Sequence, residues 1–172
     1  SLSEFNNGLL AYYPFNRNAN DATGNGHHGL VQGPVLETDR NGTLQDAYRF
    51  DGVDDNIEVL DHADFDFGSG DLSLSFWLKF NGAQQQSQIL GQSNGLGENN
   101  KWYVDYLQIY GGYKMALHFN TDANASIWLA PLAANYDTAW HLVNFVKKGT
   151  NYLAYLDGKE LSFSIGPAAI PN

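Results

Sequence analysis

The sequence contains no cysteine, which excludes disulfide bonds, thiol catalysis and cysteine-based zinc sites. It is also poor in basic residues, because 9 lysines and arginines stand against 19 aspartates and glutamates, for a net charge of −10. Binding to nucleic acid or to an anionic membrane surface needs a basic face, so this composition disfavours both. No apolar run approaches the roughly 20 residues of a membrane-spanning helix, and we expect no membrane insertion. Neutral glycans and cations remain open as partners.

The chain is long enough for one domain with a real core. It has 172 residues, of which 43% are hydrophobic, and we expect residues 1–172 to form a single domain. Its 18 glycines and 18 asparagines are scattered along the chain, as in a protein with many turns. No window of 11 or more residues has the apolar spacing of an amphipathic helix.

Short β-prone segments recur instead. Residues 72–80 alternate strictly, with leucine and phenylalanine on one face. Gly111-Gly112 and Asp157-Gly158 are typical of hairpin turns. Polar segments at 81–88 and 91–100 indicate long loops, where ligand contacts are common. The expected strands cover residues 9–15, 48–50, 56–59, 72–80, 103–110, 114–120, 126–129, 141–147, 152–156 and 160–165. This pattern predicts an all-β fold, an antiparallel two-sheet sandwich of jelly-roll type.

The sequence offers little for catalysis. Glycoside hydrolysis needs two carboxyl groups held across a cleft, but the five glutamates lie far apart and no Glu-x-Asp-x-x-Glu strand occurs. Neither a Gly-x-Ser-x-Gly elbow nor a phosphate-binding loop is present. His27 and His28 are adjacent and would point to opposite faces of a strand, which makes a poor metal pair. We expect no enzyme activity.

Calcium is the cofactor that the loop 18–26 suggests. Calcium takes six to eight oxygen ligands in a flexible loop. Asn20, Asp21 and Asn25 could supply side-chain oxygens there, and glycines let carbonyl groups turn inward. A second acidic group surrounds the turn 51–55. The alternative is that both loops are ordinary Asx-turns, and the residues alone do not decide between these readings.

A sugar platform is the third kind of site considered. Sugar rings stack on aromatic side chains, while amides and carboxylates bond the hydroxyl groups. Along 103–110, Leu107 and Ile109 are predicted to face the core, which leaves alternate residues pointing outward. In the next strand Met115 and Leu117 are predicted to be core residues. The expected ligand-binding residues are Trp102, Tyr106, Gln108, Tyr110, His118 and Trp128. The alternative is that these aromatic rings only cover the sheet, as we expect for Trp77 and Trp140.

Several segments, taken in order, resemble a known family. They are residues 8–16, 19–26, 47–55, 72–77, 140–143 and 155–159. The series is similar to the laminin-G-like, concanavalin A-like lectin/glucanase domains of bacterial surface and secreted proteins. The resemblance implies a curved jelly-roll sandwich in a secreted or cell-surface protein. It also implies binding of glycans or proteins, with a calcium ion near the N-terminal loop, where Asp21 and the region of Asn25 match.

One departure from the family concerns the end of the chain. Family domains close with a further strand, whereas this sequence stops at 165–172. A ligand aspartate from that strand would be missing, and the expected strand 9–15 would keep an unpaired edge. We expect either that the chain is truncated or that another segment or subunit covers that edge. The leading functional hypothesis is a non-catalytic, lectin-like carbohydrate-binding module. The alternative is a protein-binding adhesion or structural module of a large surface protein.

Overall fold

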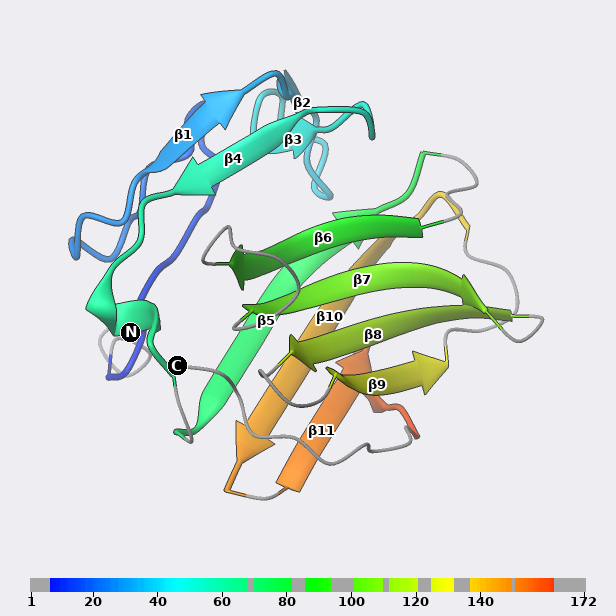
Figure 1. The fold of residues 1–172 in the computed structure, drawn as a ribbon. Coiled ribbons are helices and arrows are strands. Elements are labelled where there is room, and N and C mark those ends of the chain that lie inside the picture. Colours follow the sequence, from blue (N-terminus) through cyan, green and yellow to red (C-terminus); the bar gives the residue numbers. More distant parts are fainter. Residues whose placement is uncertain are drawn as a thin grey trace. The chain divides into compact units, whose positions relative to one another are not determined.

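The computed structural model describes residues 7–67, 70–81, 86–93, 101–109, 112–120, 125–131, 137–149 and 151–162 (Figure 1). The chain divides into two compact units, Ser1–Asp66 and Phe67–Asn172, which we describe separately. In the described residues antiparallel strands are accompanied by one short 3-10 helix, η2 (Ala63–Phe65), so the predicted all-β class is confirmed. No helix in this part of the chain is long and apolar enough to cross a membrane. The expectation of a single domain stays a prediction.

The second unit consists of two four-stranded antiparallel sheets. One has the strand order β12-β11-β10-β5 and the other β6-β7-β8-β9. Figure 1 shows the two sheets as separate layers. The strands of the first are β5 (Leu72–Lys79), β10 (Trp140–Lys148), β11 (Asn151–Leu156) and β12 (Lys159–Glu160). Those of the second are β6 (Gln86–Ser93), β7 (Lys101–Ile109), β8 (Gly112–Asn120) and β9 (Ala125–Pro131).

The core of this unit lies between the two sheets. It is a single cluster of buried residues from β7, β8, β10 and β11, against which the inward leucine and phenylalanine residues of β5 pack. The period-two burial of β5 confirms the face predicted for residues 72–80. The buried members of the cluster are Trp102, Val104, Met115, Leu117, Val143, Phe145 and Ala154.

Most of the predicted strands of this unit are present. The hairpin of β7 and β8 and the turn at Asp157-Gly158 are confirmed by the pairing register. By contrast, β6 includes residues 86–88 and 91–93, which the sequence indicated as polar loops, so that prediction is wrong for these six residues. β6 is one of the two edge strands of its sheet, and an edge strand tolerates a polar sequence. Residues 163–172, where the family's last strand was expected to be missing, lie outside the described residues.

The first unit consists of two small antiparallel pairs. β1 (Gly29–Gln32) pairs with β4 (Asn56–Val59), and β2 (Val35–Glu37) pairs with β3 (Ala47–Arg49). The acidic turn 51–55 therefore joins strands that belong to different pairs. The strands β3 and β4 were predicted within one residue of their ends, whereas β1 and β2 were not predicted.

The predicted strand at residues 9–15 is wrong. Among the described residues this segment makes no ladder with a neighbouring strand, and Phe15 has a positive φ of 58°. Its backbone is held by a loop instead, because the Tyr12 N–H donates to Asp21 Oδ1 at 3.1 Å and the Tyr12 carbonyl accepts from the Ala22 N–H at 2.8 Å. The expected open strand edge therefore does not exist at this place.

Candidate functional site

Two of the predicted ligand-binding residues are core residues. Tyr106 has an exposed fraction of 0%, and its ring packs on Phe80 with the centroids 4.4 Å apart. Trp102 is buried in the main cluster, where its Nε1 donates to Gln92 Oε1 at 3.0 Å. The outward row predicted for Tyr106 is therefore wrong, because the inward face of β7 carries Trp102, Val104 and Tyr106. Neither aromatic ring is placed to form an open sugar platform.

His118 lies on the predicted face of β8, opposite to Met115 and Leu117, but it is not exposed. Its exposed fraction is 6%. The ring stacks on Tyr103 with the centroids 4.5 Å apart, and Nε2 lies 3.7 Å from Oδ2 of the buried Asp105. The register pairs Tyr103 with His118 across the two strands, and this pairing could have identified Tyr103 and Asp105 from the hairpin alone.

The other three predicted ligand-binding side chains cannot be placed. Gln108 and Trp128 are positioned by their strands, opposite Tyr113 and Leu117 respectively, but their side chains lie outside the described residues. Tyr110 lies outside them altogether. Their role in ligand binding stays a prediction.

An aromatic surface lies on the side of β5, β10 and β11 that faces away from the core. Trp77, expected to be structural, is 43% exposed there. The register pairs Lys79 with Trp140 and Trp77 with Leu142, so the two tryptophans are diagonal neighbours on one face. In the next row Ser75, Asn144 and Tyr155 are aligned across three strands, and Asn144 Nδ2 donates to Ser75 Oγ at 2.8 Å. The outer aromatic face is the name used below for six of these residues: Trp77, Trp140, Leu142, Ser75, Asn144 and Tyr155.

A charged clamp lies at the start of β10. His141 Nδ1 is 2.7 Å from Asp157 Oδ2, and Nε2 is 3.0 Å from Asp137 Oδ1. The other oxygen of Asp157 accepts from the Leu142 N–H at 2.9 Å. The hydrogen bond to Asp157, helped by that to Asp137, raises the pKa of His141. The cluster ties the β11–β12 turn to β10.

The loop predicted to bind calcium is organised by Asp21. Its buried carboxylate accepts from the Tyr12 and Thr23 N–H groups at Oδ1, from the His27 N–H at Oδ2, and from Thr23 Oγ1 at both oxygens. Burial would raise the pKa of Asp21, but these hydrogen bonds, led by those of Thr23, lower it to about 2. A metal ion at this carboxylate would have to displace N–H and O–H donors.

The other two predicted calcium ligands have separate roles in the same loop. Asn25 Nδ2 donates to the Leu10 carbonyl at 2.8 Å and holds the preceding segment. Asn20 is exposed, and its N–H donates to Asn18 Oδ1 at 2.8 Å, the geometry of an Asx-turn. Calcium binding by Asn20, Asp21 and Asn25 remains a prediction.

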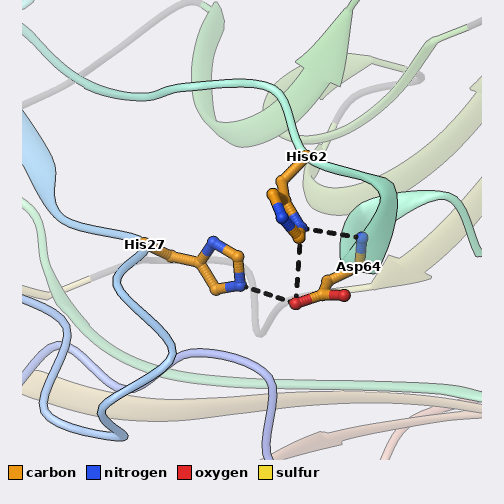
Figure 2. Close-up of side chains that lie close together, drawn as sticks. All are labelled: His27, His62 and Asp64. Atoms are coloured by element: carbon orange, nitrogen blue, oxygen red, sulfur yellow. Dashed lines mark hydrogen bonds and ion pairs between the residues drawn. The ribbon is translucent and has the colours of Figure 1, made fainter.

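Two groups in the described residues bring three metal-ligating atoms within 4.8 Å of one another. One is the acidic turn, where Asp51, Asp54 and Asp55 converge while Asp55 Oδ2 accepts from the Asp51 N–H at 2.8 Å. The other consists of His27, His62 and Asp64 (Figure 2). His27 Nε2 lies 2.9 Å from Asp64 Oδ2, and His62 Nδ1 lies 3.4 Å from the same oxygen.

The second group was not predicted from the sequence. His27 was interpreted only together with its neighbour His28, and neither His62 nor Asp64 was expected to be a ligand. The signal that could have found the group is the short spacing of His62 and Asp64, which places two ligand types within one turn.

Comparison with known proteins identifies one family. Residues 51–172 match the model of a laminin G-like family described as the concanavalin A-like lectin/glucanases superfamily. The match starts at the acidic turn and includes β4, η2 and the whole second unit. Neither the comparison with curated proteins nor that with solved structures finds a match.

Proposed function

Because the chain belongs to the concanavalin A-like lectin/glucanase superfamily, we propose that it is a non-catalytic carbohydrate-binding module of an extracellular or cell-surface protein. The superfamily includes both sugar-binding proteins and glycosidases, so membership alone leaves the role open. The observation that supports sugar binding is the outer aromatic face, on which Trp77 is 43% exposed beside the Ser75–Asn144 hydrogen bond.

The chemistry of this face suits a neutral glycan. An indole ring offers a flat apolar surface to the C–H groups of a sugar ring, and burial of apolar area stabilises the contact by about 25 cal/mol per Å². Asn144 and Ser75 lie one row away on the same face and carry amide and hydroxyl groups that can bond sugar hydroxyls. The net charge of −10 repels acidic polysaccharides, which favours neutral ones.

The same face argues for binding rather than hydrolysis. Glycosidases hold two carboxyl groups about 5–10 Å apart on either side of the scissile bond. Around Trp77 the paired strands present the hydroxyl group of Ser75 and the amide of Asn144. Those groups can bond the hydroxyl groups of a sugar, but they cannot donate a proton to a leaving group at neutral pH.

A glycan array with matched variants tests the proposal. Trp77→Ala removes the exposed indole, and Phe50→Ala removes a similarly exposed ring, at 47%, from the first unit. We expect the unchanged protein and Phe50→Ala to bind the same glycans and Trp77→Ala to bind at least about fivefold more weakly, since a stacked aromatic ring contributes about 1 kcal/mol or more. No binding by the unchanged protein, or equal binding by both variants, overturns the proposal.

A protein-binding adhesion module is the second candidate. Large apolar side chains of the first unit are exposed, among them Leu44, Val53 and Leu60. Exposed apolar groups favour a protein partner over a sugar where they gather into one patch. If the unchanged protein binds no glycan on the array, replacing Val53 and Leu60 by serine should reduce adhesion to the protein partner. Trp77→Ala should not reduce it.

A further inference from the structure

We propose that His27, His62 and Asp64 bind a divalent transition-metal ion of the zinc type. The three side chains converge from two segments of the first unit and lie close together in Figure 2. The inference does not depend on the proposed function, because the residues that carry it lie outside the outer aromatic face.

The strand pairing explains why these residues meet. β1 and β4 are antiparallel, and their register pairs Gly29 with Val59. His27 stands two residues before that pair and His62 three residues after it, so both lie at the same end of the two-stranded sheet. The short helix η2 follows immediately and turns Asp64 back toward His27.

The spacing of the ligand atoms matches a tetrahedral site. With bonds of about 2.0–2.1 Å, neighbouring ligand atoms around a tetrahedral zinc ion lie about 3.3 Å apart. The distances from Asp64 Oδ2 are 2.9 Å to His27 Nε2 and 3.4 Å to His62 Nδ1. All three ligand atoms lie within 4.8 Å of one another. Small side-chain movements therefore suffice to enclose an ion.

The donor set selects the class of metal. Two imidazoles and one carboxylate suit zinc, copper, nickel and iron, whereas calcium and magnesium require oxygen ligands. Three protein ligands leave a fourth position for water or another ligand. His62 and Asp64 are exposed, so an ion can enter from solvent.

His27 is held in place before any ion binds. Its N–H donates to Asp21 Oδ2 at 3.3 Å, and its carbonyl accepts from the Tyr13 hydroxyl at 2.7 Å. The ring is buried against Phe65, with the centroids 4.7 Å apart. Asp21, predicted as a calcium ligand, thus supports the loop that carries a different metal ligand. A fixed ligand loses little freedom on binding, which favours affinity.

Binding would exchange existing hydrogen bonds for coordinate bonds. The ion would replace the proton between His27 Nε2 and Asp64 Oδ2. It would also compete with the Asp64 N–H, which donates to His62 Nδ1 at 3.2 Å. Because protons compete for the imidazole nitrogens, the affinity should fall in acid.

Calorimetric titration of the tag-free protein with Zn²⁺ tests the site. His62→Asn removes one imidazole while keeping a side chain that can cap η2, and Asp64→Asn removes the carboxylate. His28→Asn is the matched control, since it removes an exposed histidine next to His27 while its amide oxygen can still accept from the Asp21 N–H, as His28 Nδ1 does at 3.2 Å. We expect one zinc ion per chain, an affinity at least about 100-fold lower in both site variants, and no change in the control.

Two further readouts identify the kind of site. Co²⁺ should give the strong visible absorption of tetrahedral coordination in the unchanged protein and lose it in His62→Asn. Zn²⁺ should raise the melting temperature of the unchanged protein and of His28→Asn, but not that of His62→Asn or Asp64→Asn. A ligand that binds only the native state stabilises that state. The proposal is overturned if the protein binds no Zn²⁺, if His62→Asn binds as tightly as the control, or if Ca²⁺ displaces Zn²⁺ at equal concentration.

Discussion

Tyr106 of β7 and Met115 of β8 are direct cross-strand partners, and both are buried. Partners in an antiparallel pair point to the same face, so once Met115 is assigned to the core, Tyr106 must follow it. The alternation along each strand predicted the core position of Met115 correctly but placed Tyr106 on the opposite face. Carrying the register through the hairpin would have removed the contradiction.

Replacement of Tyr106 should therefore affect stability rather than sugar binding. Tyr106→Ala empties a fully buried site packed on Phe80, and we expect a loss of about 3–5 kcal/mol in the free energy of unfolding. Phe50→Ala, at an exposed ring, should cost much less. Urea denaturation of the two variants measures the difference. If Tyr106→Ala folds stably but loses glycan binding, the result would support the sequence-based prediction that Tyr106 binds the sugar.

The parts of the fold that sequence predicted are those with local signals. The alternation of residues 72–80 and the Asp157-Gly158 turn depend on neighbours in the chain, and both are confirmed. β6 was missed because an edge strand does not need an apolar sequence. The segment 9–15 was β-prone, but hydrogen bonds to the loop around Asp21 determine its conformation.

The candidate sites show the same difference between features with local sequence signals and features that depend on distant residues. His27 and Asp64 are 37 residues apart, and only the β1–β4 register brings them together. The alternation of β5 places Trp77 on the face away from the core, but its exposure also depends on the neighbouring strands, which a single strand does not reveal. In both cases the residue type indicated the chemistry, but the sequence did not show which residues lie beside it in the fold.

Replacement of Asp21 should weaken the first unit. Asp21→Asn keeps the shape of the side chain but turns an amide N–H₂ toward N–H and O–H donors. We expect a loss of roughly 1–3 kcal/mol in the free energy of unfolding, as for a buried charged acceptor. Because folding lowers the pKa of Asp21 from 3.8 to about 2, its contribution is present above pH 4 and is lost as the pH falls toward 2.

Denaturation of both proteins between pH 7 and pH 2 measures this effect. The stability difference between the unchanged protein and Asp21→Asn should shrink over the acid part of the range. A difference that stays constant down to pH 2 would mean that the Asp21 carboxylate has the same pKa in the folded and unfolded chains.

Calcium in the loop 18–26 is retained as a proposal from the family resemblance, and chelation tests it. A calcium ion that binds only the folded chain predicts that EDTA lowers the melting temperature. The donors already bonded to Asp21 would then have to be displaced, so Asp21→Asn should abolish the effect. His62→Asn is melted in parallel, because EDTA also removes zinc. An unchanged melting curve in this variant contradicts a structural calcium ion.

The clamp at His141 should make stability depend on pH near neutrality. Both ring nitrogens lie within hydrogen-bond distance of carboxylates, those of Asp157 and Asp137, so the cluster is complete when His141 is protonated. Folding raises the pKa of His141 above its ordinary 6.5. The stabilisation is therefore fully present below pH 6.5 and is lost as the pH rises through the pKa of the folded protein.

His141→Gln isolates this contribution. Glutamine can bond one of the two aspartates without taking up a proton, so the variant should lose the decline in stability above pH 6.5 that we expect of the unchanged protein. His28→Asn serves as the control, since it also removes a histidine but leaves the clamp intact, and its pH profile should follow that of the unchanged protein. Urea midpoints measured across this range decide the matter. Parallel profiles for the unchanged protein and His141→Gln would mean that the clamp holds a neutral imidazole, and that the β11–β12 turn is tied to β10 mainly by the bond from the Leu142 N–H to Asp157.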